Sequence, residues 1–101
     1  MTRFLVTYHG GKPPADGAMA DQMKLAFGQW LQQAGEAVAD PGAPVRPVAS
    51  VPSGAISPPG EIGGYSIVEA ASVELAIALL TTHPFVARGG TLRVHEALAV
   101  S

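Results

Sequence analysis

The stretch GGYSIVEAASVELAIALLTTHPFVARGGTLRVHEA, residues 63–97, decides the fold. Residues 65–70 are rich in aromatic and β-branched side chains, and residues 91–97 alternate between polar and apolar positions, so each segment predicts a strand. Between them, Ser72 is a suitable helix N-cap, and the apolar residues up to position 80 recur at helical spacing. The helix should end at His83, because a residue before proline avoids helical geometry.

The first third of the chain predicts another strand and another helix. Residues 3–9 (RFLVTYH) have the composition of a strand and end at a glycine pair. From Met19 to Ala34 the apolar residues return at the spacing of one helical face. Asp16 is the candidate N-cap of this helix, and Gly35 is its candidate left-handed stop.

Residues 37–62 hold most of the chain's nine prolines, together with several glycines and serines. This composition predicts a long Pro/Gly-rich loop over residues 41–62. One strand interrupted by proline fits either residues 37–40 or residues 47–51, and proline would restrict it to the edge of a sheet. Because long ordered loops in small domains often act as lids or interface arms, a lid over a ligand cleft is one hypothesis for this segment.

The predicted order of elements is strand, helix, weak strand, strand, helix, strand. This is the split βαβ arrangement of a ferredoxin-like α+β fold, in which an antiparallel sheet carries both helices on one face. The other face is not expected to be polar throughout, since residues 4–8 place apolar side chains on both sides of the first strand. A second copy of the same sheet is the simplest cover. We therefore expect a homodimer that forms a dimeric α/β barrel.

Length, charge and composition exclude several classes of protein. The 101 residues suit a single domain spanning residues 1–101. The absence of cysteine excludes disulfides, thiolate metal ligands and a cysteine nucleophile. The six Lys and Arg residues are scattered and the net charge is -2, so nucleic acid is not an expected partner. No segment has the length and apolarity of a membrane span or a signal peptide, which predicts a cytoplasmic protein with no membrane contact.

The segments GGYSIVE (63–69), HPF (83–85) and GGTLRV (89–94), with a helix between the first two, resemble the YCII-related family. The resemblance implies a ferredoxin-like dimeric α/β barrel. It implies little about activity, because catalysis has been proposed for this family more than established. In part of the family, a histidine of the first helix faces an aspartate just before the Pro-aromatic pair, and this dyad is the suspected active site. Lys24 and His83 stand at those two positions here, so the dyad is absent from this chain.

The predicted topology gathers the end of the first strand, the start of the first helix, the start of the third strand and the end of the second helix at one edge. The titratable or aromatic residues expected there are Tyr8, His9, Lys24, Tyr65, His83 and Arg88. His83 or His9 is the candidate general base, and Lys24 or Arg88 would bind an anionic substrate. In the structural alternative, His83 caps the C-terminus of the second helix and Lys24 is solvated.

A second group of polar residues lies on the last predicted strand, where Arg93 and His95 share one face. Glu69 is the candidate ion-pair partner of Arg93, and such a pair would stabilise the fold or clamp a ligand. The three histidines and Glu69 lack the short spacing of a metal site, so we expect no metal. The glycine pairs match neither a phosphate-binding loop nor a dinucleotide-binding motif, so we expect no cofactor.

These patterns favour a small dimeric domain that binds a small anionic or aromatic metabolite in a cleft. Tyr8, Lys24, Tyr65, Arg88 and Arg93 are the candidate ligand-binding residues. If the protein turns over a substrate, His83 or His9 would transfer the proton. The alternative is a non-catalytic interaction or accessory domain that acts through dimer assembly alone.

Overall fold

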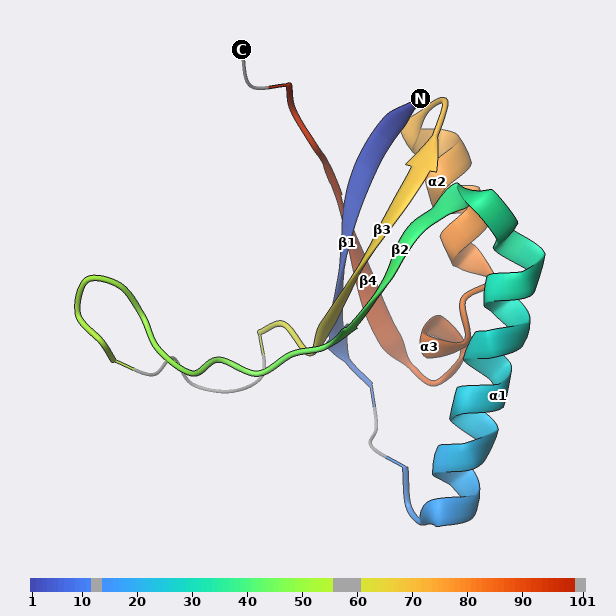
Figure 1. The fold of residues 1–101 in the computed structure, drawn as a ribbon. Helices are drawn as coiled ribbons and strands as arrows, with labels where there is room; N and C mark the ends of the chain where they lie inside the picture. Colours follow the sequence, from blue (N-terminus) through green and yellow to red (C-terminus); the bar gives the residue numbers. More distant parts are fainter. Residues whose placement is uncertain (12–13, 56–60, 100–101) are drawn as a thin grey trace.

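A computed structural model describes residues 1–11, 14–55 and 61–99 of the chain. The elements in order are β1 (Thr2–Gly10), α1 (Gly17–Ala34), a 3-10 turn (Gly35–Ala37), β2 (Val38–Pro44), β3 (Gly64–Ala70), α2 (Val73–Thr81), α3 (Pro84–Ala87) and β4 (Gly90–Glu96) (Figure 1). The sheet has the strand order β2-β3-β1-β4, and each neighbouring pair is antiparallel. The chain therefore has the predicted α+β class.

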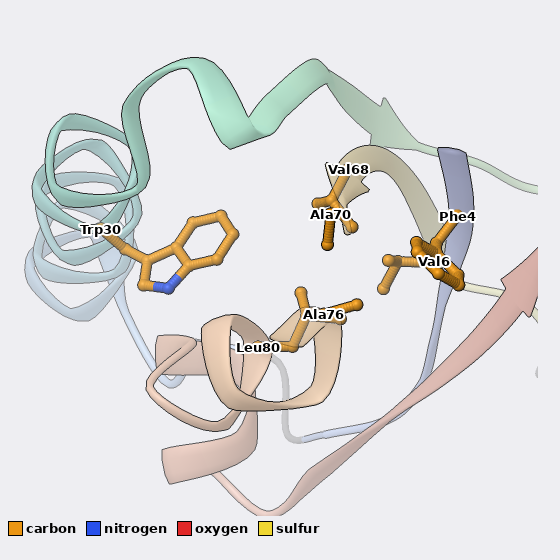
Figure 2. Close-up of a cluster of buried hydrophobic side chains, with 7 residues drawn as sticks. All are labelled: Phe4, Val6, Trp30, Val68, Ala70, Ala76 and Leu80. Atoms are coloured by element: carbon orange, nitrogen blue, oxygen red, sulfur yellow. The ribbon is translucent and has the colours of Figure 1, made fainter. Parts of the chain in front are cut away.

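The helices cover one side of the sheet (Figure 1), and the hydrophobic core lies between these helices and the sheet. Side chains of a strand alternate between its two faces, so every second residue of β1 and β3 points toward the helices. The buried apolar residues are Phe4, Val6, Trp30, Val68, Ala70, Ala76 and Leu80 (Figure 2). Phe4 and Val68 are direct partners in the β1–β3 register, so the centre of the core comes from the two central strands.

The helix boundaries follow local capping chemistry, as the sequence predicts. The Asp16 carboxylate accepts a hydrogen bond from the Met19 amide at 2.8 Å and caps α1. Gly35 has a φ of 59° and ends that helix. The Ser72 hydroxyl accepts from the Leu75 amide at 3.2 Å and caps α2. Because each cap satisfies backbone groups that the first or last turn leaves free, the helices begin and end close to the predicted positions.

The predicted loop over residues 41–62 is partly wrong, because β2 continues to Pro44. Of the two strand candidates, residues 37–40 contribute to β2, whereas residues 47–51 form no strand. The expected edge position is confirmed, since β2 pairs with β3 alone. The register shifts twice between Val38 and Ala43, and this irregular pairing allows prolines within the strand. Residues 56–60 of the predicted loop lie outside the described part of the chain.

The irregular pairing of β2 requires a glycine at position 42. Gly42 has a φ of 74°, and its amide donates to the Asp40 carboxylate at 2.8 Å. A Cβ atom at this position would overlap the carbonyl oxygen of Tyr65 in β3. Both the backbone conformation and the close approach of the two strands therefore exclude a side chain.

We expect Gly42→Ala to lower the free energy of unfolding by roughly 2 kcal/mol or more, because it adds a backbone clash to the conformational strain. Gly54→Ala is the matched control, since Gly54 has a similar φ of 77° but open space around its Cα atom. Urea unfolding followed by Trp30 fluorescence measures both variants. Equal losses in the two would show that the contact between β2 and β3 is not what requires Gly42.

Candidate functional site

The candidate site is a cavity of about 650 Å³ between the sheet, α1 and α3. Its size falls in the range of pockets that hold small organic molecules. Backbone from the ends of β1, β2 and β3 forms one wall. The larger side chains that line it are Tyr8, Met23, Phe27, His83, Phe85 and Arg88. Most of these side chains are apolar or aromatic, so the cavity presents few groups that could bind a polar ligand.

A chain of hydrogen bonds runs along one side of the cavity and joins α3 to β1, β3 and β2. The Phe85 amide lies 3.0 Å from Nδ1 of His83, and Nε2 of His83 lies 2.9 Å from the Tyr8 hydroxyl. The Tyr8 hydroxyl lies 2.7 Å from Oγ of Ser66, and that oxygen lies 2.7 Å from the carbonyl oxygen of Pro41. Four elements are therefore connected through three side chains.

The direction of each bond in this chain follows from its two ends. A backbone amide can only donate, so Nδ1 of His83 accepts from Phe85 and a neutral ring carries its proton on Nε2. A carbonyl oxygen can only accept, so Ser66 donates to Pro41 and accepts from the Tyr8 hydroxyl. Nε2 of His83 consequently donates to the Tyr8 oxygen. Reasoning from either end gives the same donors and acceptors, and every hydrogen in this hydrogen-bond chain has an acceptor.

The charge states of the two ring side chains agree with this assignment. Burial, together with a smaller effect of the positive charge of Arg88, lowers the pKa of His83 from its usual 6.5 to about 4. Burial raises the pKa of the Tyr8 phenol above its usual 10, against a smaller opposite effect of the Ser66 hydrogen bond. Both groups are therefore neutral near pH 7.

His83 caps a helix in this structure, but not the helix end that was expected. Thr82 is the C-cap of α2, whereas Nδ1 of His83 caps the N-terminus of α3. The expected C-cap is wrong because Pro84 starts a new helix immediately after the α2 terminus. A capping imidazole must offer a free lone pair, which a neutral ring has and a protonated ring lacks.

The structure brings four of the six expected residues to one cavity: Tyr8, Tyr65, His83 and Arg88. Tyr65 borders it where β3 begins, although its register partner Thr7 places the Tyr65 side chain on the opposite face of the sheet. Lys24 was expected at this edge, but it is exposed and does not line the cavity. Met23 and Phe27 occupy the cavity-facing side of α1, and the next residue along a helix points about 100° away.

His9 was also expected beside His83, but it lies on the other face of the sheet. Tyr8 faces the helices, and the following residue of a strand must face the opposite way. Nε2 of His9 lies 2.7 Å from the Thr7 hydroxyl, and Nε2 of His95 lies 3.3 Å from the same oxygen. His9 therefore belongs to a separate polar group on the face of the sheet that carries no helices, which we term the open face.

The open face has its own hollow of about 470 Å³, lined by Thr7, His9, Glu61, Ile62, Arg93 and His95. The expected pair of Arg93 with Glu69 is wrong. Glu69 accepts instead from Nε of Arg3 at 3.0 Å, because the register sets Arg3 beside Glu69 and sets Arg93 beside Thr7. Within residues 1–11, 14–55 and 61–99, no three His, Asp or Glu side chains converge to hold a metal ion.

Sequence reasoning missed the roles of Ser66, Met23 and Phe27. Ser66 is a polar residue on the inward face of β3, next to buried Val68, and a serine at such a position usually needs an internal partner. A serine on the inward face of a strand was therefore the feature from which a buried hydrogen bond could have been predicted. Met23 and Phe27 were expected only as part of the apolar stripe of a helix, and a stripe does not distinguish packing from a cavity wall.

No protein-family model matches the chain, and no curated protein matches it. No helix in the described part of the chain has both the length and the apolar character needed to cross a bilayer. The function is therefore inferred from the geometry of the cavity.

We expect the protein to lose stability as the pH falls from about 6.5 toward 4, with His83 as one cause. The pKa of His83 is lower in the folded chain than its usual 6.5, so the unfolded chain binds a proton first, and the stabilisation present above that pH is lost on acidification. A shift to about 4 corresponds to a loss of about 3 kcal/mol. Urea unfolding at several pH values measures it.

The control is His83→Gln, which does not titrate, so its stability should depend less on pH across the same interval. A long-range ¹H–¹⁵N spectrum of the wild-type protein should place the imidazole proton on Nε2 at pH 7. A proton on Nδ1 would contradict the direction assigned to the hydrogen-bond chain, and equal pH dependence in the two proteins would contradict the lowered pKa of His83.

Proposed function

We propose that this chain is a small-molecule-binding domain whose ligand occupies the cavity between the sheet, α1 and α3. The observation that carries the proposal is a cavity of about 650 Å³ with a predominantly apolar and aromatic lining, in a domain of this size. Apolar cavities with a few polar groups are the usual form of small-molecule sites. The strand order and the single helical layer support a ferredoxin-like assignment, and the resemblance to the YCII-related family stays part of the proposal.

Binding is favoured over acid-base catalysis by the state of the histidines. Both ring nitrogens of His83 are engaged within the protein, and its lone pair on Nδ1 accepts from the Phe85 amide, so the ring would have to release Phe85 before it could accept a proton from a substrate. His9 faces the other side of the sheet and does not line the cavity. In this proposal, His83 is a positioning residue that orients Tyr8 and α3.

A larger side chain in the cavity should weaken binding of a ligand. Met23→Trp places a larger side chain in the cavity, and we expect it to weaken binding of the neutral fluorescent probe N-phenyl-1-naphthylamine by roughly tenfold or more. Leu25→Trp is the matched control, because Leu25 lies on the same helix, is 63% exposed and does not line the cavity. The fluorescence increase of the probe on titration with protein measures both variants.

Native mass spectrometry of the freshly purified protein complements the titration, since a reproducible extra mass that Met23→Trp removes would identify the natural ligand. If the probe binds wild-type protein and both variants equally, the cavity is not the site. If nothing binds wild-type protein, the non-catalytic assembly function becomes the better proposal.

The proposed domain is a homodimer joined through the open face of the sheet. Leu5 is 40% exposed there and lies directly opposite Ile67 in the register, so the two form an apolar pair on a face without helices. A two-fold axis would bring the same pair from a second copy onto it. This surface also supports the alternative function, an interaction or accessory domain that acts through assembly alone.

We expect the wild-type protein to sediment as a dimer and Leu5→Lys to sediment as a monomer, because a buried unpaired charge would oppose association. Leu25→Lys is the control, since it changes an exposed leucine on the outer side of α1. Sedimentation velocity distinguishes the species. A monomeric wild-type protein, or a Leu5→Lys variant that remains dimeric, would contradict the open face as the interface.

A further inference from the structure

We infer that the ligand of the cavity is an aromatic carboxylate and that Arg88 binds its carboxylate group. This inference rests on the proposed function, because it names the class of molecule that the same cavity takes. It also gives a role to a cation that no contact in the described residues neutralises.

Arg88 is the one charged side chain among the described residues that line the cavity. No Asp or Glu lines it, and the ion pair found in the described part of the chain joins Arg3 to Glu69 at the far end of β1. Nε of Arg88 is buried and has no hydrogen-bond partner within those residues. A guanidinium group that is partly removed from water and unpaired is unfavourable, so an anion that enters the cavity gains an interaction that the folded protein alone does not supply.

The Arg88 side chain is held in position by an aromatic ring. Its guanidinium carbon lies 5.4 Å from the centroid of the Phe85 ring, within the range of a cation–π contact. The backbone amide of Arg88 also caps the end of α3. A planar guanidinium that is held in one place can donate two parallel hydrogen bonds to a carboxylate, which is the pairing that its geometry suits best.

The other polar side chains of the cavity leave little capacity for further polar groups on a ligand. Tyr8 donates to Ser66 and accepts from His83, while His83 uses both ring nitrogens within the protein. The Tyr65 side chain projects to the open face. A sugar or another polyol would lose its water contacts without gaining partners, so the body of the ligand must be largely apolar.

The shape of the lining favours a planar body. The rings of Tyr8 and Phe85 meet edge to face with centroids 5.1 Å apart, and Phe27 and Met23 come from α1. Aromatic rings prefer edge-to-face or offset contacts with other rings, and the methionine sulfur also packs well against a ring. One aromatic ring system with one carboxylate therefore matches both the apolar wall and the one cation that the described lining contains.

Titration calorimetry with 2-naphthoate and its neutral counterpart 2-naphthamide tests this inference at pH 7. The two molecules share the same ring system and differ in charge. We expect wild-type protein to bind 2-naphthoate roughly tenfold to a hundredfold more tightly than 2-naphthamide, the range of a charge-assisted hydrogen-bonded pair. Arg88→Gln should bring the two affinities close together, and Arg88→Lys should retain part of the preference because it keeps the charge.

Arg46→Gln is the matched control, since it removes an exposed arginine that lines neither the cavity nor the hollow on the open face and should leave the preference unchanged. Equal binding of the two molecules by wild-type protein would overturn the inference while leaving the proposed function in place. If neither molecule binds but N-phenyl-1-naphthylamine does, the cavity takes neutral ligands and the inference is wrong. If none of the three binds, the proposed function fails, and the inference fails with it.

Discussion

The hydrogen-bond chain from the Phe85 amide through His83, Tyr8 and Ser66 to the Pro41 carbonyl is the constraint on which the site depends. It joins α3, the two central strands and the edge strand beside the cavity. Each member is oriented by the next, and the low pKa of His83 keeps the ring in the neutral form that the chain requires. Loss of one member would leave buried polar groups without partners, which costs more than the bond itself contributes.

The same chain explains why the cavity is apolar in spite of the polar residues that surround it. Tyr8, Ser66 and His83 direct their donors and acceptors at each other, so what they present to the cavity is mainly ring surface. Arg88 differs, because its charge stacks on Phe85 and has no carboxylate partner in the described residues. Among the residues that the structure describes, the cavity therefore combines an apolar wall with one unpaired cation, and both the proposed function and the ligand class follow from that combination.

Alternation along β1 separates two chemically different faces of one sheet. Tyr8 joins the cavity, whereas Thr7 and His9 belong to the open face, where the Thr7 hydroxyl lies within hydrogen-bond distance of both His9 and His95. Residues adjacent in the sequence thus serve different surfaces. The sequence grouped His9 with His83 because both stand near the predicted edge, but position along a strand does not give the side of the sheet.

Local pattern was enough to predict the elements with strong periodicity or capping chemistry: β1, β3, β4, both longer helices, their caps at Asp16 and Ser72, and the edge position of the weak strand. These features depend on residues close together in the chain, where backbone preference and capping bonds act. Pattern failed for the length of β2, because its pairing is sustained by β3 across a register shift that Gly42 permits. Sequence pattern also placed Lys24 wrongly at the cavity and predicted the wrong ion-pair partner for Glu69.

Those failures share one physical reason. Which side chains meet across a sheet depends on register, and which face of a helix borders a cavity depends on packing; both arise from contacts between residues far apart in the chain. Tertiary structure decided that Glu69 meets Arg3, that His83 gives its lone pair to the N-terminus of α3, and that Nε of Arg88 is buried without a hydrogen-bond partner among the described residues. The residues supplied the functional groups of the site, and the long-range pairing of β1 with β3 and β4 determined which of them act together.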